Sequence, residues 1–258
     1  MLQLIKKWAE NDTQCRLDRI RPGASIERPA ATPQGAAGGL RSLVFIGLAA
    51  FLSACSEPAN LPAAEQASVR LEGERHYVSG YPARAESGLV NMVVEIPAGT
   101  QAKWEVNKSQ GSLDWERQDG AYRVVQYLPY VGNYGMLPRT LLPKSLGGDG
   151  DPLDILLLGA ALPRGTVLAV RPVGVLRLLD RGEQDDKIIA VPTAGPMHEV
   201  DDIDTLREHY AGVSEIVEQW FAGYKGPGQM ESLGYADRAA ALQMIEQASA
   251  AYEAEHGK

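Results

Sequence analysis

The sequence predicts an α+β protein in which a small closed β-barrel is covered on the outside by C-terminal helices. Three observations support this prediction. Short β-prone runs fill the chain between residues 90 and 191, and two helical patterns follow them. The pair Asp119-Gly120 separates two of these runs, and Asp-Gly is a strong signal for a hairpin turn. The chain has 258 residues, 45% of them hydrophobic, which is enough to bury a core.

The expected strands are runs of apolar, β-branched or alternating residues. The run Val90–Ile96 ends at Pro97. Residues 103–106 alternate between polar and apolar, which would place Lys103 and Glu105 on one face of a strand. The other expected strands are the hairpin arms at residues 112–118 and 121–127 and the runs at residues 154–158, 166–179 and 187–191.

Two helices are expected after the strands. Apolar side chains at helical spacing predict the first helix, and a weaker stripe predicts the second. The first stripe contains Leu206, Val213, Ile216, Val217, Trp220 and Phe221, and the second contains Leu242, Ile245 and Tyr252.

The charge balance and the few metal-binding side chains exclude several classes of function. The formal net charge is −8, which argues against nucleic acid as a partner because duplex binding needs a basic surface. An acidic protein can still bind a polyanion if metal cations bridge the like charges. The two cysteines, Cys15 and Cys55, exclude a disulfide framework or a Cys-rich zinc site. The four histidines show no paired spacing, so a His-based zinc site is not expected either.

The N-terminal part has the pattern of a targeting segment. Arg41 precedes an apolar run at residues 43–52, which as a helix would span roughly half a bilayer core. The run ends in Leu-Ser-Ala-Cys at Cys55 and resembles the lipobox of bacterial lipoproteins, in which this cysteine is acylated. The alternative is a buried helix that contains a cysteine by chance.

The expected organisation follows from this pattern. Residues 1–54 would be an N-terminal extension and signal segment, 55–75 a flexible tether and 76–258 the folded domain. The protein would then be a membrane lipoprotein facing the periplasm, with lipid at Cys55 as its only contact with the membrane. A cytoplasmic location is the alternative.

An acidic cluster at residues 148–154 is the most informative feature. It places Asp149, Asp151 and Asp154 within six positions, and Pro152 can redirect the chain so that Asp154 joins the other two. Converging carboxylates repel each other and favour a bound Mg²⁺, Mn²⁺ or Ca²⁺. The alternative is a solvated Asp/Gly turn. An EF-hand loop is excluded, because Asp154 stands where that loop requires Gly.

Six motifs in this order resemble those of the soluble family I inorganic pyrophosphatases. They are Glu95-Ile96-Pro97, Lys103-x-Glu105, Asn133-Tyr134-Gly135, Asp149-x-Asp151-Pro152-x-Asp154, Asp180 with Asp185 and Lys187, and Tyr224-Lys225. Taken singly, the last two sites also read as a charged hairpin loop and a lysine at a helix end. The resemblance implies a five-stranded OB-like β-barrel with flanking helices. It also implies hydrolysis of pyrophosphate to two phosphates with several Mg²⁺ ions, Mn²⁺ being possible, and a homo-oligomer.

The resemblance also implies roles for single residues. Asp149, Asp154 and Asp185 would hold a metal pair that shares the attacking water, and Asp180 and Glu95 would help to bind further metal ions. Asp151 resembles the general base. The expected phosphate ligands and their supporting residues are Lys103, Glu105, Arg123, Tyr130, Tyr134, Lys187, Tyr224 and Lys225.

Three positions depart from the family pattern or are ambiguous in it. Arg117 and Arg123 lie on opposite arms of the expected hairpin, and Arg123 is favoured because its distance to the tyrosine-rich turn is close to the family's. Arg181 stands where the family usually has Glu, and could hold product phosphate. Val131 stands where Pro is common. The competing hypotheses are another Mg-dependent phosphohydrolase and a non-catalytic lipoprotein that binds metal or phosphate.

Overall fold

The computed structural model describes residues 69–142, 148 and 150–257. The expected signal segment, Cys55 and Asp149 lie outside these residues. Within this part of the chain, none of the helices combines the length and the apolar character that a membrane span requires.

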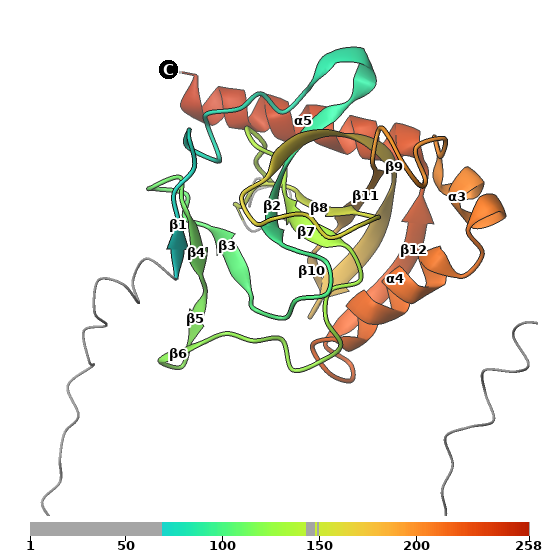
Figure 1. The fold of residues 1–258 in the computed structure, drawn as a ribbon, viewed down its shortest axis with the longest axis horizontal. Coiled ribbons are helices and arrows are strands. Elements are labelled where there is room, and N and C mark those ends of the chain that lie inside the picture. The colour runs from blue at the N-terminus through green and yellow to red at the C-terminus, as the bar shows by residue number, and fades with distance from the viewer. Residues whose placement is uncertain (1–68, 143–147, 149, 258) are drawn as a thin grey trace, which may run out of the picture. The chain divides into compact units, whose positions relative to one another are not determined.

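Five strands form a closed ring, which confirms the predicted fold class (Figure 1). Around the ring, β2 (Val90–Ile96) pairs with β7 (Asn133–Met136), and β7 pairs with β8 (Asp154–Leu157). Strand β8 runs parallel to β11 (Lys187–Val191), the one parallel pair among the strands of this ring, and β11 pairs with β9 (Val167–Asp180). The start of β9 returns to β2 and closes the ring.

Strand β9 closes the ring because it is long enough to pair with several neighbouring strands. Its first residues pair with β2, and its later residues pair with β11 on one side and with β12 (Met230–Ala236) on the other. Pro172 lies where the register with β11 shifts, which fits a residue that has no N–H to donate. Beyond Asp180 the chain turns into the short strand β10 (Glu183–Gln184).

A second, smaller sheet lies beside the ring. It contains β1 (Arg70–Leu71), β4 (Leu113–Trp115) and β3 (Trp104–Val106). Strands β5 (Arg117–Gln118) and β6 (Ala121–Tyr122) form the predicted hairpin, and its turn residues Asp119 and Gly120 have φ values of 52° and 82°. Residues 70 and 71 fall within the expected tether but pair with β4.

Three helices follow, where two were expected. The first predicted stripe is divided between α3 (Ile203–His209) and α4 (Val213–Gly223), because Gly212 breaks the helix with a φ of 86°. The second corresponds to α5 (Arg238–His256). Strand β12 lies between α4 and α5, so the expected order of strands first and helices last is wrong at this point. A short 3-10 turn, Glu86–Gly88, precedes β2.

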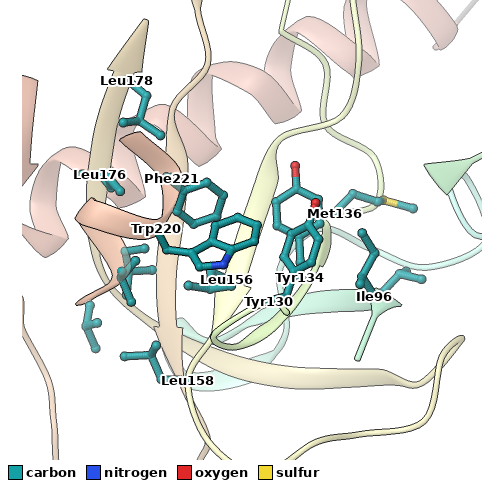
Figure 2. Packing of buried hydrophobic residues seen from close by; sticks show 14 of the residues in the cluster. Ile96, Tyr130, Tyr134, Met136, Leu156, Leu158, Leu176, Leu178, Trp220 and Phe221 are labelled. Carbon is teal, nitrogen blue, oxygen red and sulfur yellow. The ribbon is translucent and has the colours of Figure 1, made fainter. Parts of the chain in front are cut away.

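Both faces of the ring strands are buried, and each packs against a different helix. One face carries Leu156 and Ile189 and joins an aromatic group that includes Tyr130, Tyr134 and Trp220 (Figure 2). The opposite face packs against α5 through the residues Val90, Met92, Val94, Ile155, Leu157, Ile188, Ala190, Ala241, Ile245 and Ala248. Burial on both faces explains why these strands read as continuous apolar runs.

Candidate active site

A cavity of about 330 Å³ lies against the ring, and most of its walls are charged or phenolic. The structure brings together eleven of the residues expected to form a site. They are Glu95, Lys103, Glu105, Arg123, Tyr130, Tyr134, Asp151, Asp154, Asp185, Tyr224 and Lys225. Two more are connected through contacts described below, Lys187 and Asp180, while Asp149 and Cys55 lie outside the described residues.

A β-bulge aims Glu95 at the cavity. The register between β2 and β7 shifts between Val94 and Ile96, so Glu95 leaves the alternation of the strand. Its side chain is buried, and Oε1 accepts a hydrogen bond from the backbone N–H of Val106 at 2.8 Å. Burial raises the pKa of Glu95 to about 8, although Lys103 works in the opposite direction. Burial therefore shifts this carboxyl toward its neutral form.

Lys103 is a permanent positive charge in the wall. Burial alone would lower its pKa, but the nearby Tyr130, Glu95 and Asp154 raise the pKa above its ordinary value. Its Nζ lies 5.2 Å from the centre of the Tyr134 ring. An ammonium group held in this way can bind a phosphate oxygen without losing its proton.

Two lysines bridge the carboxylates of the site. The Lys187 side chain is 2% exposed, and its Nζ contacts Asp154 Oδ2 at 2.6 Å and Asp185 Oδ1 at 2.5 Å. Lys225 Nζ contacts Asp180 Oδ2 at 2.8 Å and lies 3.8 Å from Asp185 Oδ2. The lysines thus link Asp154, Asp185 and Asp180 in one chain of alternating charges.

The pKa of Asp154 reflects these contacts. Burial would raise it, but Lys187, Lys103 and a hydrogen bond from Tyr134 hold the pKa below its usual range. The pKa of Lys187 is raised, because the two carboxylates outweigh its burial. Asp154 is therefore anionic and Lys187 cationic at neutral pH.

Asp151 meets a lysine that the sequence analysis did not single out. Lys108 Nζ donates to Asp151 Oδ1 and lies 3.3 Å from the backbone oxygen of Gly150. Lys108 belongs to a turn in which the Asn107 side chain accepts hydrogen bonds from the next residues. A lysine in a polar turn resembles any surface lysine, so the sequence held no signal for this contact.

Two tyrosines of the cavity wall, Tyr130 and Tyr224, pack against Trp220. The rings of Trp220 and Tyr224 stack at 4.9 Å, and Tyr130 lies 4.5 Å from Trp220. Arg123 lines the cavity and is held by two hydrogen bonds to Glu116, at 2.9 and 2.8 Å. Arg117 does not line it, since its side chain donates to Gly120 O and lies over the Tyr122 ring.

The donor set fits a hard divalent cation. Among the described residues, no three His, Cys, Asp or Glu side chains are arranged to hold one metal ion. However, Asp180 Oδ1 is buried and accepts no hydrogen bond from the part of the chain that the structure describes. A buried acceptor without a donor is costly unless a ligand completes it. The unpaired Asp180 Oδ1 could accept a metal cation, and it lies beside carboxylates that are paired with lysines in this structure.

Comparisons with known proteins agree with this geometry. Residues 92–253 match the model of the family described as inorganic pyrophosphatase. An inorganic pyrophosphatase from Synechocystis is 36% identical over 174 residues, which cover 66% of this chain and 95% of the relative. A relative with the same description from Schizosaccharomyces pombe is 37% identical, but the match spans only 55% of its length. The solved structure of inorganic pyrophosphatase from Thermus thermophilus aligns with a TM-score of 0.59 and 31% identity, covering 69% of this chain and 99% of that one.

Proposed function

The chain belongs to the inorganic pyrophosphatase family, and we propose that its charged cavity hydrolyses inorganic pyrophosphate to two phosphates. One observation carries the proposal: acidic and basic side chains line the same small cavity in nearly equal number. The basic groups suit phosphate oxygens, and the carboxylates suit the cations that must accompany a small polyanion.

The metal is Mg²⁺, and its ligands come from Asp149, Asp154, Asp185, Asp180 and Glu95; Mn²⁺ suits the same oxygens. When bound, the metal ions lower the pKa of water, so that a nucleophile forms near neutral pH, and they neutralise phosphate charge. The unpartnered Asp180 Oδ1 and the ionisable Glu95 support this assignment.

The chain's own residues do the remaining work. Asp151 accepts the proton of the attacking water, whose oxygen forms a bond to one phosphorus while the bridging P–O bond breaks. Lys103, Lys187 and Tyr134 hold the phosphoryl group that is attacked. Arg123, Lys225, Tyr224 and Tyr130 hold the leaving phosphate and stabilise the negative charge it gains. Glu105, which also lines the cavity, helps to orient Lys103.

Phosphate release tests the proposal. The protein is incubated with pyrophosphate, ATP and a phosphate monoester, with Mg²⁺ and with a chelator. We expect pyrophosphate to be cleaved fastest and only with the metal. Faster turnover of ATP or the monoester would assign the cavity to another phosphohydrolase reaction, and no turnover of any substrate would favour a protein that only binds metal or phosphate.

Location and assembly are part of the same proposal. The pattern from Arg41 to Cys55 supports a lipid anchor at Cys55 and an enzyme that faces the periplasm and recovers phosphate. Metabolic labelling with a fatty acid, compared with Cys55→Ser, tests it, and an unlabelled parent protein would indicate the cytoplasm. A homo-oligomer is proposed as well; exposed Ile216 on α4 and Leu233 on the neighbouring β12 are apolar side chains available for it, and light scattering measures it.

A further inference from the structure

A second cavity adjoins the first beside Arg123, Tyr224 and Lys225, the residues proposed to hold the leaving phosphate. It has a volume of about 480 Å³ and shares Arg123, Tyr224 and Lys225 with the first cavity. Arg181 and Gln126 are among the residues that line only the second cavity. A ligand that extends from the first cavity past Arg123 and Lys225 would therefore enter the second.

The second cavity favours an anion. Arg123, Arg181 and Lys225 line it together with two carboxylates, Glu116 and Asp180. Arg123 is already paired with Glu116, and Lys225 with Asp180. Within the described residues Arg181 forms no ion pair, so it is the cation of this cavity whose charge no carboxylate already neutralises.

Arg181 is held in place by backbone and side-chain contacts. It is the first residue of the two-residue turn between β9 and β10 and has a φ of 51°. Its N–H donates to the backbone oxygen of Gln229 at 2.9 Å, and its Nε donates to Gln229 Oε1 at 2.7 Å. Since Nε is used by Gln229, the two terminal nitrogens remain for the fork-like contact that arginine makes with phosphate.

From this geometry we propose that the chain also cleaves inorganic tripolyphosphate, with Arg181 binding the third phosphoryl group in the second cavity. The inference rests on the proposed pyrophosphatase function, because the reacting groups are the same. Water oxygen bonds to the terminal phosphorus in the first cavity, and its proton goes to Asp151. The bridging bond to the middle phosphorus breaks, and the electron pair stays on the bridging oxygen of the departing pyrophosphate. No oxidant or reductant is needed, and the products are phosphate and pyrophosphate.

The test compares kcat/KM for tripolyphosphate with kcat/KM for pyrophosphate, both with Mg²⁺. Phosphorus NMR follows the consumption of each substrate. We expect Arg181→Glu to lower the ratio of tripolyphosphate to pyrophosphate at least about tenfold, as loss of a charged hydrogen bond predicts. Arg181→Lys keeps the charge but not the fork, so its ratio should lie between those of the parent and Arg181→Glu. Arg177→Glu is the matched control, since Arg177 is an exposed arginine on the same strand, β9, that lines neither cavity, and it should leave the ratio unchanged.

The outcomes separate this inference from the proposed function. A parent protein that cleaves pyrophosphate but not tripolyphosphate, or a ratio that Arg181→Glu leaves unchanged, would overturn the inference alone. If Arg181→Glu leaves the ratio unchanged but is inhibited less by free phosphate than the parent protein, Arg181 would bind the product instead. A parent protein that cleaves neither compound would overturn both proposals. Because the ratio compares two substrates on the same protein, partial unfolding of a variant cannot mimic the expected result.

Discussion

Replacing Lys187 with methionine should destabilise the metal-free protein strongly, because this lysine separates two carboxylates. Its ammonium contacts Asp154 and Asp185 at 2.6 and 2.5 Å, and its side chain is 2% exposed. Removing one partner of a buried ion pair costs about 3–5 kcal/mol. The two aspartates retain 29% and 21% exposure, so water solvates them in part and the cost should lie near the lower end.

The same substitution should make stability depend more strongly on Mg²⁺. A loss of about 3 kcal/mol corresponds to a fall in Tm of roughly 6–12 °C for a domain of this size. A cation bound between Asp154 and Asp185 would replace the missing charge. At about one hundred times its Kd, such a cation contributes about 2.7 kcal/mol. The variant should therefore gain more stability from Mg²⁺ than the parent protein, in which Lys187 already neutralises both groups.

Thermal unfolding of both proteins, with chelator and with saturating Mg²⁺, measures this difference. Lys108→Met is the matched control, because Lys108 also contacts a carboxylate of the cavity but its side chain is 55% exposed. An exposed pair of this kind is worth at most about 1 kcal/mol. The reasoning is refuted if Lys187→Met is as stable as the parent in chelator. It is also refuted if Mg²⁺ raises the Tm of Lys187→Met and of the parent equally.

Three further predictions address the proposed base Asp151, the small sheet and the ring. Asp151→Asn should keep the parent Tm but lose about 10²–10⁴-fold in kcat, and an unchanged turnover number would remove Asp151 from its role. Arg70→Gln should cost about 0.2–1 kcal/mol at neutral pH, because hydrogen bonds from Arg70 and others hold the pKa of Asp114 low despite its burial. A lowered carboxyl pKa contributes its full stability above the ordinary value of 3.8, so the difference in urea unfolding should shrink below pH 3.8 and vanish as the pH falls through the lower pKa of the folded state; a difference that does not shrink with falling pH would contradict this assignment. Gly135→Ala should cost about 3 kcal/mol or more, because its Cβ would lie 1.8 Å from Val93 O, and a normal Tm and soluble yield would contradict the close approach.

The strands that are buried on both faces could be predicted from the sequence. The strands that contain a glycine at a close approach or a register shift could not. Strands β2, β9 and β11 read as apolar runs because both of their faces are buried. Strand β7 was missed, since Asn-Tyr-Gly-Met looks like a turn; it is a strand because Gly135 lets the backbone of β2 approach closely. Strand β12 was missed for a similar reason, as Gly234 at its register shift reads as a break.

The members of the site could be predicted from motifs, but their mutual contacts could not. The motifs name Glu95, although only the bulge in β2 shows why a residue in an apolar strand faces the cavity. They also name Asp154 and Lys187, whereas the direct contact between them depends on the parallel pairing of β8 and β11. Lys108 belongs to neither case, because its contact with Asp151 joins two loops that no local pattern relates.

The charge arrangement explains how an acidic protein can fold with this cavity and still bind a polyanion. Lysine ammonium groups hold Asp154, Asp185 and Asp180 together, so the carboxylates need no metal to coexist in the folded chain. Divalent cations held by these carboxylates would free the lysines from their partners and make them available to phosphate oxygens. Metal binding and substrate binding would then be coupled through the same side chains. It follows that Mg²⁺ should raise the affinity for pyrophosphate even in Asp151→Asn, which lacks the proposed proton acceptor but keeps every lysine.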